Sequence, residues 1–339
     1  MSRAITYDKT GPSSVLSLVD RQTTEPGPGQ VRVKVVVSGV NPTDWKARQG
    51  GADSKPLPTP QVPNQDGSGV VVEVGADVTG LEIGQRVWLW DVAWQNPEGT
   101  AQEHVTLPAR KVVTLPDQET FDTGASLGIP ALTAHRALTA HEGVPAQLVP
   151  GALTGIVVLV TGGAGAVGHA AIQLAVWAGA TVITTVSGDE KAELARRAGA
   201  EHVINYRTES VAERVKAVSE RGVDLVVEVA PLANLDVGLE VLAPNGTIAV
   251  YVSESDEPLP IPVRPSMIKN VRFQFIMTYT VTDEQKSASV AAVSAALADG
   301  ALRVGDEHGL PLTRFALADT AQAHDAVEQA TVGKVLIDI

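Results

Sequence analysis

The sequence predicts an α/β protein in which a β-rich N-terminal part is followed by a doubly wound parallel sheet. Up to about residue 120, short alternating apolar runs stand between turn residues, as in Val31–Val37, Val70–Val74 and Val87–Trp90, and this pattern is typical of β-strands. From about Thr123, helical and strand patterns alternate. Repeated βα units of this kind favour a parallel sheet.

The alternating part begins with a helical pattern at Thr123–Ala140. Strands are expected at Ile156–Val160, Thr181–Val186, His202–Asn205, Leu225–Val229 and Thr247–Val252, and helices at Ala166–Ala178, Glu190–Ala198, Ser210–Ser219 and Ala233–Leu242. After the proline-rich segment Pro258–Pro265, the pattern predicts a β-like run Val271–Tyr279, helices Thr282–Ala298 and Ala318–Ala330, and a last strand Lys334–Ile339. By pattern alone, these last elements either extend the sheet or return to the first part.

Length and composition narrow the class of protein. With 339 residues, the chain exceeds the length of roughly 250–300 residues at which a single core stops growing, so two domains are expected. The net charge is −13, from 26 basic and 39 acidic residues without a basic block, which disfavours nucleic acid and anionic membranes as partners. The absence of cysteine excludes disulfides, thiolate zinc ligands, iron–sulfur clusters and cysteine nucleophiles.

Neither a signal peptide nor a membrane span is expected. Residues Met1–Asp20 contain no basic segment followed by an apolar core, so the cytoplasm is the expected location. Residues 143–188 contain no Asp, Glu, Lys or Arg, but glycine and proline interrupt this stretch too often for a span. A buried strand, turn and helix explain it better.

A glycine-rich loop follows the strand Ile156–Val160. The run Gly163-Ala164-Gly165-Ala166-Val167-Gly168 fits the pattern G-x-G-x-x-G, with a strand before it and an apolar-faced helix after it. In that context, backbone N–H groups and the helix N-terminus can approach a pyrophosphate. The loop therefore predicts a dinucleotide-binding site. It lacks the lysine and hydroxyl ending of a P-loop, which disfavours phosphoryl transfer.

The end of the next strand indicates which dinucleotide is bound. An acidic residue there would bind the ribose 2′-OH of NAD, but Thr181–Val186 ends in Ser187-Gly188, with Lys191 close behind. A hydroxyl and an ammonium suit a 2′-phosphate, so NADPH is the predicted cofactor. The competing interpretation takes Asp189 or Glu190 as the NAD-binding acid, although acids at this place can also simply favour the start of a helix.

Short segments in a fixed order run through nearly the whole chain. They are Gly39–Lys46, Asn64–Val71, Gly84–Val87, Gly99–His104, Leu132–His135, Ala164–Gly168, Ala198–Ala200, Val203–Arg207 and Gly333–Val335. In order and spacing, they resemble the zeta-crystallin-type quinone oxidoreductases, which are zinc-free medium-chain dehydrogenases/reductases. The resemblance implies a GroES-like catalytic domain at residues 1–122 and a Rossmann NADPH-binding domain at 123–265. It also implies a C-terminal segment, 266–339, that completes the sheet and returns to the catalytic domain.

The same resemblance implies a cofactor cleft between the domains, a homodimer and no metal. In zinc-dependent relatives, the positions of Asn41 and Gln65 hold a cysteine and a histidine. One departure is the segment Val144–Gly155, which is longer than the usual loop before the nucleotide-binding strand, so the local interface is expected to differ.

The resemblance also assigns roles to single residues. Asn41 and Thr133 are expected near the nicotinamide and its ribose. Ser187, Lys191 and Tyr206 are expected around the adenosine phosphate, and Ala230 beside the cofactor. Phe275 and Met277 lie in the segment that is expected to reach the carboxamide. Several have structural alternatives: Asn41 as the turn residue before Pro42, Tyr206 as a surface aromatic and Phe275 as core. Asp44 is a candidate catalytic polar or proton-relay residue, with a structural role in binding backbone amides as the favoured alternative.

The predicted function is zinc-independent hydride transfer from nicotinamide C4 of NADPH to a quinone. The cofactor would carry the chemistry, and Asn41 with nearby N–H groups would stabilise charge on the acceptor oxygen. The alternative is reduction of activated carbon–carbon double bonds in enones or related alkenes, because acceptor choice depends on pocket shape. A third, less favoured hypothesis is a non-enzymatic NADPH-binding protein.

Overall fold

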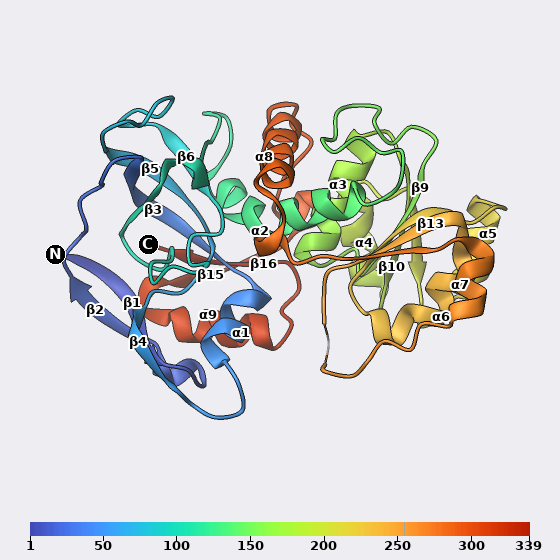
Figure 1. Cartoon of the computed structure of the whole chain (residues 1–339), viewed down its shortest axis with the longest axis horizontal. Coiled ribbons are helices and arrows are strands. Elements are labelled where there is room, and N and C mark those ends of the chain that lie inside the picture. The colour runs from blue at the N-terminus through green and yellow to red at the C-terminus, as the bar shows by residue number, and fades with distance from the viewer. Residues whose placement is uncertain (254) are drawn as a thin grey trace. The chain divides into compact units, whose positions relative to one another are not determined.

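The computed structural model describes residues 1–253 and 255–339. The chain divides into two compact units, one of Met1–Ile129 with Pro311–Ile339 and one of Pro130–Leu310 (Figure 1). The domain boundaries expected after residues 122 and 265 lie a few residues before the first of these division points and well before the second. Residues 266–310 therefore lie with the second unit. No helix in the described residues combines the length and apolar character needed to cross a membrane.

The first unit contains two sheets. One has the strand order β2-β1-β4, and the other has the order β15-β16-β3-β5-β6-β8, with β7 also paired to β3. The strands are β1 Ser2–Lys9, β2 Ser17–Arg21, β3 Gln30–Val40, β4 Pro56–Gln61, β5 Asp66–Val74, β6 Arg86–Leu89, β7 His104–Pro108, β8 Val112–Thr114, β15 Leu312–Ala316 and β16 Lys334–Asp338. Two helices accompany them, α1 Pro42–Gln49 and α9 Thr320–Glu328.

Alternation of side chains builds the core of this unit. Val31, Val33 and Val35 of β3 are buried at every second position and pack in one cluster with Val71 and Val87 of the neighbouring strands. Because successive strand residues point to opposite faces, this spacing buries one face of β3. The last strand, β16, pairs antiparallel with β3, so the C-terminal end of the chain is part of this sheet.

The second unit is built on a six-stranded sheet with the order β11-β10-β9-β12-β13-β14, in which every pairing is parallel. Its strands are β9 Val157–Thr161, β10 Thr181–Val186, β11 His202–Asn205, β12 Val223–Glu228, β13 Leu242–Val250 and β14 Arg272–Phe275. Its helices are α3 Ala166–Trp177, α4 Asp189–Arg197, α5 Val211–Val218, α6 Pro231–Val241, α7 Val263–Lys269 and α8 Asp283–Ala298, while α2, Phe121–Leu138, contains the division point.

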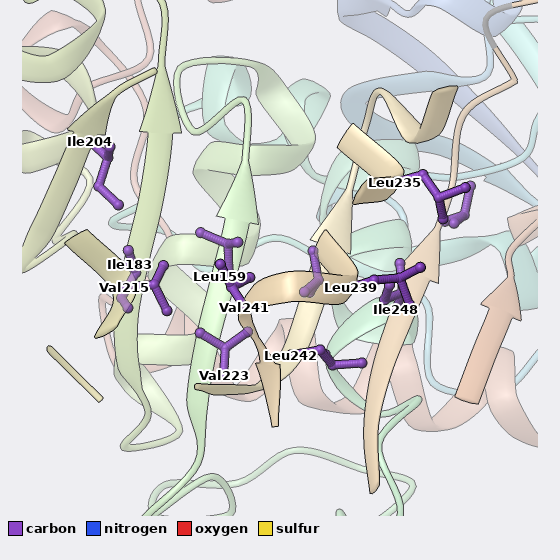
Figure 2. Close-up of a cluster of buried hydrophobic side chains, with 12 residues drawn as sticks. Leu159, Ile183, Ile204, Val215, Val223, Leu235, Leu239, Val241, Leu242 and Ile248 are labelled. Atoms are coloured by element: carbon purple, nitrogen blue, oxygen red, sulfur yellow. The ribbon is translucent and has the colours of Figure 1, made fainter. Parts of the chain in front are cut away.

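Apolar side chains from strands and helices form the core of this sheet. Figure 2 shows Leu159 of β9, Ile183 of β10 and Ile248 of β13 in one cluster with Leu235 and Leu239 of α6. Parallel strands are covered on both faces, which explains why these strands are apolar runs without alternation. The predicted α/β class, with a GroES-like β-rich part and a Rossmann-like parallel sheet, is confirmed.

The structure differs from the sequence patterns in three places. Residues 42–49 form helix α1 inside the part expected to be β, and residues 263–269 form α7 across the end of the proline-rich segment. In both helices the proline, Pro42 or Pro265, lies in the first turn, where its missing N–H has no intrahelical acceptor anyway. The β-like run 271–279 is a strand only at Arg272–Phe275.

The long segment 144–155 is tied to its surroundings by a buried histidine. Leu148 and Leu153 are fully buried, and the Leu148 N–H donates to His135 Nε2 at 3.3 Å. His135 Nδ1 lies 2.8 Å from Ser289 Oγ, which donates to the Gln285 carbonyl. Because Nε2 accepts, the neutral ring carries its proton on Nδ1 and donates it to Ser289. Two buried leucines and one hydrogen bond therefore anchor a segment whose other residues are mostly exposed.

His135 makes stability depend on pH. Burial, with a smaller effect of Arg136, lowers the pKa of His135 from 6.5 to about 4. Below pH 6.5 the unfolded chain therefore binds a proton at His135 that the folded chain does not bind. The stabilisation of the fold by the neutral His135 ring is complete above pH 6.5, the pKa in the unfolded chain, and is lost as the pH falls toward 4. The loss amounts to at most about 1.4 kcal/mol per pH unit.

We expect the destabilisation caused by His135→Gln to be smaller at pH 5.5 than at pH 7.5, measured as the free energy of urea unfolding. His202→Gln, at a partly exposed histidine of the same unit, is the control, with an expected change below about 0.5 kcal/mol at both pH values. A His135→Gln effect that stays constant with pH would contradict the buried neutral state.

Candidate functional site

The glycine loop joins β9 to α3 in the second unit. Gly162 has a φ of 69°, a conformation that favours glycine. A Cβ at Gly163 would collide with Thr184 Oγ1, and one at Gly168 with the Gly162 carbonyl oxygen, so the protein's own packing requires glycine at both places. At Gly165, by contrast, a Cβ would meet nothing closer than 3.5 Å. The fold leaves this side of the loop open.

That open side faces the start of α3, for which Gly165 is the N-cap. The first N–H groups of a helix have no intrahelical acceptor, and the helix dipole favours an anion there. Ala166, Val167 and Gly168 belong to this first turn. The loop is therefore an open, glycine-lined cradle at a helix N-terminus, and it fits the pyrophosphate of a dinucleotide.

The predicted 2′-phosphate residues lie around the end of β10. Ser187 directly follows this strand, and Lys191 is in the first turn of α4, which begins at Asp189. The Tyr206 N–H donates to the Val186 carbonyl at 3.1 Å, which places Tyr206 next to the same strand end. Its side chain is 53% exposed. The sequence-distant Tyr206 is thus brought close to Ser187.

A cavity of about 200 Å³ opens at the carboxyl ends of β9 and β12. The strand order reverses between these two strands, and in open parallel sheets ligands bind at such a switch point. Predicted residues Tyr206 and Ala230 line the cavity together with Gly162 of the loop. Its remaining walls are Leu159, Thr161, Thr185, Val211, Glu228, Val229, Ala233, Asn234, Val237 and Gly238.

Glu228 is the buried carboxylate of this cavity, and the sequence analysis did not single it out. It is the last residue of β12, and its Oε1 accepts hydrogen bonds from the Ala230 N–H at 2.5 Å, Asn234 Nδ2 at 2.9 Å and Thr161 Oγ1 at 3.0 Å. Burial raises the pKa of Glu228, while the hydrogen bonds from Ala230, Asn234 and Thr161 oppose the rise. Its signal in the sequence is an acid that directly follows the apolar run Leu225–Val227.

The other predicted cofactor residues of this unit lie apart from the cavity walls. Thr133 Oγ1 lies 2.7 Å from Thr278 Oγ1, and both side chains are buried. The Thr278 carbonyl in turn accepts from Lys286 Nζ at 2.6 Å. Phe275 and Met277 are 58% and 51% exposed, so Phe275 is not core.

In the first unit, Asn41 belongs to a buried charged network. Its Nδ2 donates to Asp66 Oδ2 at 2.7 Å, and its Oδ1 accepts from Lys334 Nζ at 2.6 Å. Lys334 Nζ also lies 3.6 Å from Asp66 Oδ2, and Asp66 accepts from the Ile129 N–H at 2.9 Å. These contacts determine which way the Asn41 amide points. One of its two Nδ2 hydrogens remains outside the contacts to Asp66 and Lys334.

Sequence reasoning missed the roles of Asp66 and Lys334. Both residues lie in segments that carry the family resemblance, Asp66 in Asn64–Val71 and Lys334 in Gly333–Val335. Only the antiparallel pairing of β16 with β3, which sets Val335 opposite Val40, brings Lys334 beside Asn41. Burial raises the pKa of Asp66 to about 6, while Lys334 and Asn41 oppose the rise. Burial lowers the pKa of Lys334, and Asp66 and Asp44 oppose that shift.

Asp44 binds backbone amides. Its Oδ2 accepts from the Asn41 N–H at 2.7 Å and its Oδ1 from the Gln65 N–H at 3.1 Å. The first bond caps α1, because Asn41 is the N-cap of that helix. Burial and the neighbouring Asp66 raise the pKa of Asp44. Both carboxylate oxygens are therefore engaged in holding the segments that carry Asn41 and Gln65.

Comparison with known proteins places the chain in a family. Residues 27–117 match the alcohol dehydrogenase GroES-like domain, and residues 166–299 match the family described as zinc-binding dehydrogenase. Quinone oxidoreductase of Sus scrofa is 31% identical over 315 residues, which cover 92% of this chain and 90% of the relative. This chain is a medium-chain dehydrogenase/reductase of the quinone oxidoreductase type. The family resemblance stated from the sequence is confirmed, and the chain is an oxidoreductase.

Two further relatives of this medium-chain dehydrogenase/reductase bear on its chemistry. A mycobacterial protein whose structure was solved in complex with NADPH is 30% identical, with a TM-score of 0.82 and full coverage of both chains. A 2-haloacrylate reductase from a Burkholderia species is 31% identical over 348 residues, which cover 98% of each protein.

One family description names zinc, and the donor atoms here do not fit that metal. Asn41 Oδ1 already accepts from the Lys334 ammonium, and an amide is neither the thiolate nor the imidazole that zinc prefers. Gln65 supplies a second amide. Within residues 1–253 and 255–339, no group of three or more His, Cys, Asp or Glu side chains is arranged to hold a metal ion.

The buried network of this medium-chain dehydrogenase/reductase should depend on the Lys334 charge. Replacing Lys334 by Met would leave the Asp66 carboxylate buried without its cation, and we expect the free energy of unfolding to fall by about 3–5 kcal/mol. The loss should be larger at pH 8 than at pH 5, because protonation of Asp66, whose pKa is already raised to about 6, removes the unpaired charge.

Denaturant unfolding of Lys334→Met beside Lys55→Met, an exposed lysine of the same unit, would measure this. A loss no greater than that of the control, or one independent of pH, would contradict a stabilising role for the ion pair.

Proposed function

We propose that this protein is an NADPH-dependent quinone oxidoreductase that reduces its small-molecule acceptor without zinc. The observation that carries the proposal is the glycine loop, whose Gly165 side is open although the fold itself does not require glycine there. The name of the Sus scrofa relative and the NADPH complex of the mycobacterial relative support the cofactor and the acceptor class. A cytoplasmic location belongs to the same proposal and suits a chain with no cysteine for disulfides.

Bound NADPH supplies a hydride from C4 of its nicotinamide ring. We assign the pyrophosphate to the loop Gly163–Gly168 and the 2′-phosphate to Ser187 and Lys191, whose hydroxyl and ammonium suit a doubly charged anion. Thr133 and Asn41 are assigned to the nicotinamide ribose and ring. The uncommitted Nδ2 hydrogen of Asn41 would donate to the acceptor oxygen on which negative charge develops, from an orientation that Asp66 and Lys334 hold.

Reduction of activated carbon–carbon double bonds is the second candidate function. The Burkholderia relative named 2-haloacrylate reductase favours it, since haloacrylates contain such a bond and the relative matches along nearly the whole chain. The same hydride donor and the same N–H donor would serve both acceptor classes. Acceptor choice would then depend on the shape of the acceptor pocket.

We further propose that two copies of the chain associate through the edge strand β14. This strand ends the six-stranded sheet, and an unpaired edge presents N–H and C=O groups that another strand can bind. Exposed apolar side chains lie on β14 and on α7 just before it: Val263, Met267, Ile268 and Phe275. A second copy that pairs with β14 would cover them by two-fold symmetry.

The function can be tested by following NADPH oxidation at about 340 nm with benzoquinone, naphthoquinone, an alkyl enone and a simple ketone. We expect quinone turnover with NADPH that a chelator does not change, because hydride transfer here needs no metal. Turnover of the enone without quinone turnover would support the second candidate, and tight NADPH binding without any turnover would support a non-enzymatic protein.

Lys191→Ala provides the cofactor control for this assay. Loss of a hydrogen bond to a charged phosphate should raise the Kd for NADPH by roughly tenfold or more and leave the Kd for NADH unchanged. Lys216→Ala, an exposed lysine on α5, should change neither value. An equal effect of Lys191→Ala on both cofactors would contradict the assignment of the 2′-phosphate.

Association through β14 predicts a dimer by light scattering that Ile268→Asp converts to a monomer, because the substitution would bury a carboxylate in the interface. Ile83→Asp is the matched control, since Ile83 and Ile268 are each 71% exposed. A dimer that persists in Ile268→Asp and dissociates in Ile83→Asp would overturn the assigned surface.

A further inference from the structure

Strand β13 begins with a bulge in its pairing with β12. Leu242 lies opposite Val223. The next pair in the register is Thr247 opposite Leu225, so residues 243–246 of β13 face one residue of β12. Extra residues in one of two paired strands are left outside the ladder and bend the chain there. Residues 243–246 therefore form a local turn where the chain passes from helix α6 into the sheet.

The geometry of this turn restricts two of its residues. Asn245 has a φ of 65°, a left-handed conformation that asparagine and glycine tolerate better than most other residues. A Cβ at Gly246 would meet Leu242 Cγ at 2.5 Å and the Ala243 carbonyl oxygen at 2.9 Å. The second of these atoms belongs to the backbone, so a side-chain movement cannot relieve that contact. The fold therefore requires glycine at position 246 and favours asparagine before it.

Asn245 differs from the other asparagines of the chain. The sequence has seven, and only Asn245 is followed by glycine. Its side chain is exposed, and it takes part in none of the side-chain hydrogen bonds within residues 1–253 and 255–339. The side-chain nitrogens of four other asparagines donate hydrogen bonds inside the protein: Asn41, Asn64, Asn96 and Asn234.

Asn270 is a natural control for Asn245. It is also exposed, and its φ of 51° lies in the same left-handed region. Its side chain likewise makes no hydrogen bond to any residue that the structure describes. The difference is the following residue, which is the β-branched Val271. Because a branched side chain crowds its own backbone nitrogen and glycine leaves it open, the two sites separate the effect of the neighbour from that of exposure.

We propose that Asn245 is a site of spontaneous deamidation, in which the Gly246 nitrogen attacks the side-chain carbonyl carbon of Asn245. The new N–Cγ bond closes a cyclic imide, the Cγ–Nδ2 bond breaks, and ammonia leaves with the proton of the Gly246 N–H. Water then opens the ring at either of its two carbonyl carbons, which gives aspartate or isoaspartate. These steps consume only water and need no oxidant, reductant or cofactor.

The two products should affect the fold differently. Aspartate tolerates the left-handed conformation, so it should change only the charge of an exposed position. Isoaspartate carries the main chain through the former side-chain carbon and so lengthens the backbone. Leu242, against which the turn packs, is 1% exposed and belongs to the buried cluster of Figure 2. A longer backbone should therefore disturb this packing and lower the temperature of thermal unfolding.

The test incubates the full chain at mildly alkaline pH, where the attacking nitrogen loses its proton more easily, and then maps its peptides by mass spectrometry. We expect the unmodified Asn245 peptide to be lost first, the Asn270 peptide to be retained, and the unfolding temperature of the incubated protein to fall. Asn245→Gly keeps the φ that the turn needs and has no amide to lose, so incubation should not lower its unfolding temperature. Asn245→Asp before incubation should unfold at the wild-type temperature, which attributes the fall to isoaspartate.

The wild-type chain is sufficient to overturn the proposal, whether or not the variants fold. Conversion of Asn270 as fast as that of Asn245 would overturn it, because exposure alone would then decide. Conversion of Asn245 only after unfolding in denaturant would overturn it as well, because the turn would then protect the amide. Wild type that contains isoaspartate at position 245 and still unfolds at its original temperature would contradict the predicted disturbance of the turn.

Discussion

The parallel direction of all six strands in the second unit is the constraint on which its candidate site depends. Because the strands run the same way, the carboxyl ends of β9, β10 and β12 meet at one edge of the sheet. The reversal of strand order between β9 and β12 opens a cavity there, beside the glycine loop. The apolar core in Figure 2 packs between these strands and the helices that cover them. The same packing therefore stabilises the sheet and fixes the positions of the strand ends that form the site.

In the first unit, buried charged groups position the candidate site residue Asn41, whereas in the second unit a glycine loop forms part of the candidate site. Lys334, Asp66 and Asp44 lie in the interior and are paired with one another, with Asn41 or with backbone amides. Burying such groups costs free energy unless each is bound, and the benefit here is orientation, because Asn41 is held at both ends of its amide. The α1 helix begins at this point because Asp44 caps it.

Much of the fold could be predicted because its signals are local. The strands Thr181–Val186 and His202–Asn205 lie where the apolar runs placed them, and the loop Gly163–Gly168 stands between strand and helix as its spacing indicated. The helices at 42–49 and 263–269 were not predicted, because they are only eight and seven residues long and each contains a proline, which is tolerated in a first turn. The roles assigned to Thr133, Ser187, Lys191, Phe275 and Met277 remain predictions.

The sequence by itself determined the α/β class, the glycine loop with its preference for an anion, and the family, since periodicity, glycine spacing and ordered segments are properties of neighbouring residues. Only the tertiary structure brought Lys334 to Asn41 and Tyr206 to the end of β10, and only it showed that Glu228 Oε1 accepts three hydrogen bonds at the cavity. These facts depend on strand register and on packing between segments far apart in the chain, and no local pattern encodes the distance between two such atoms.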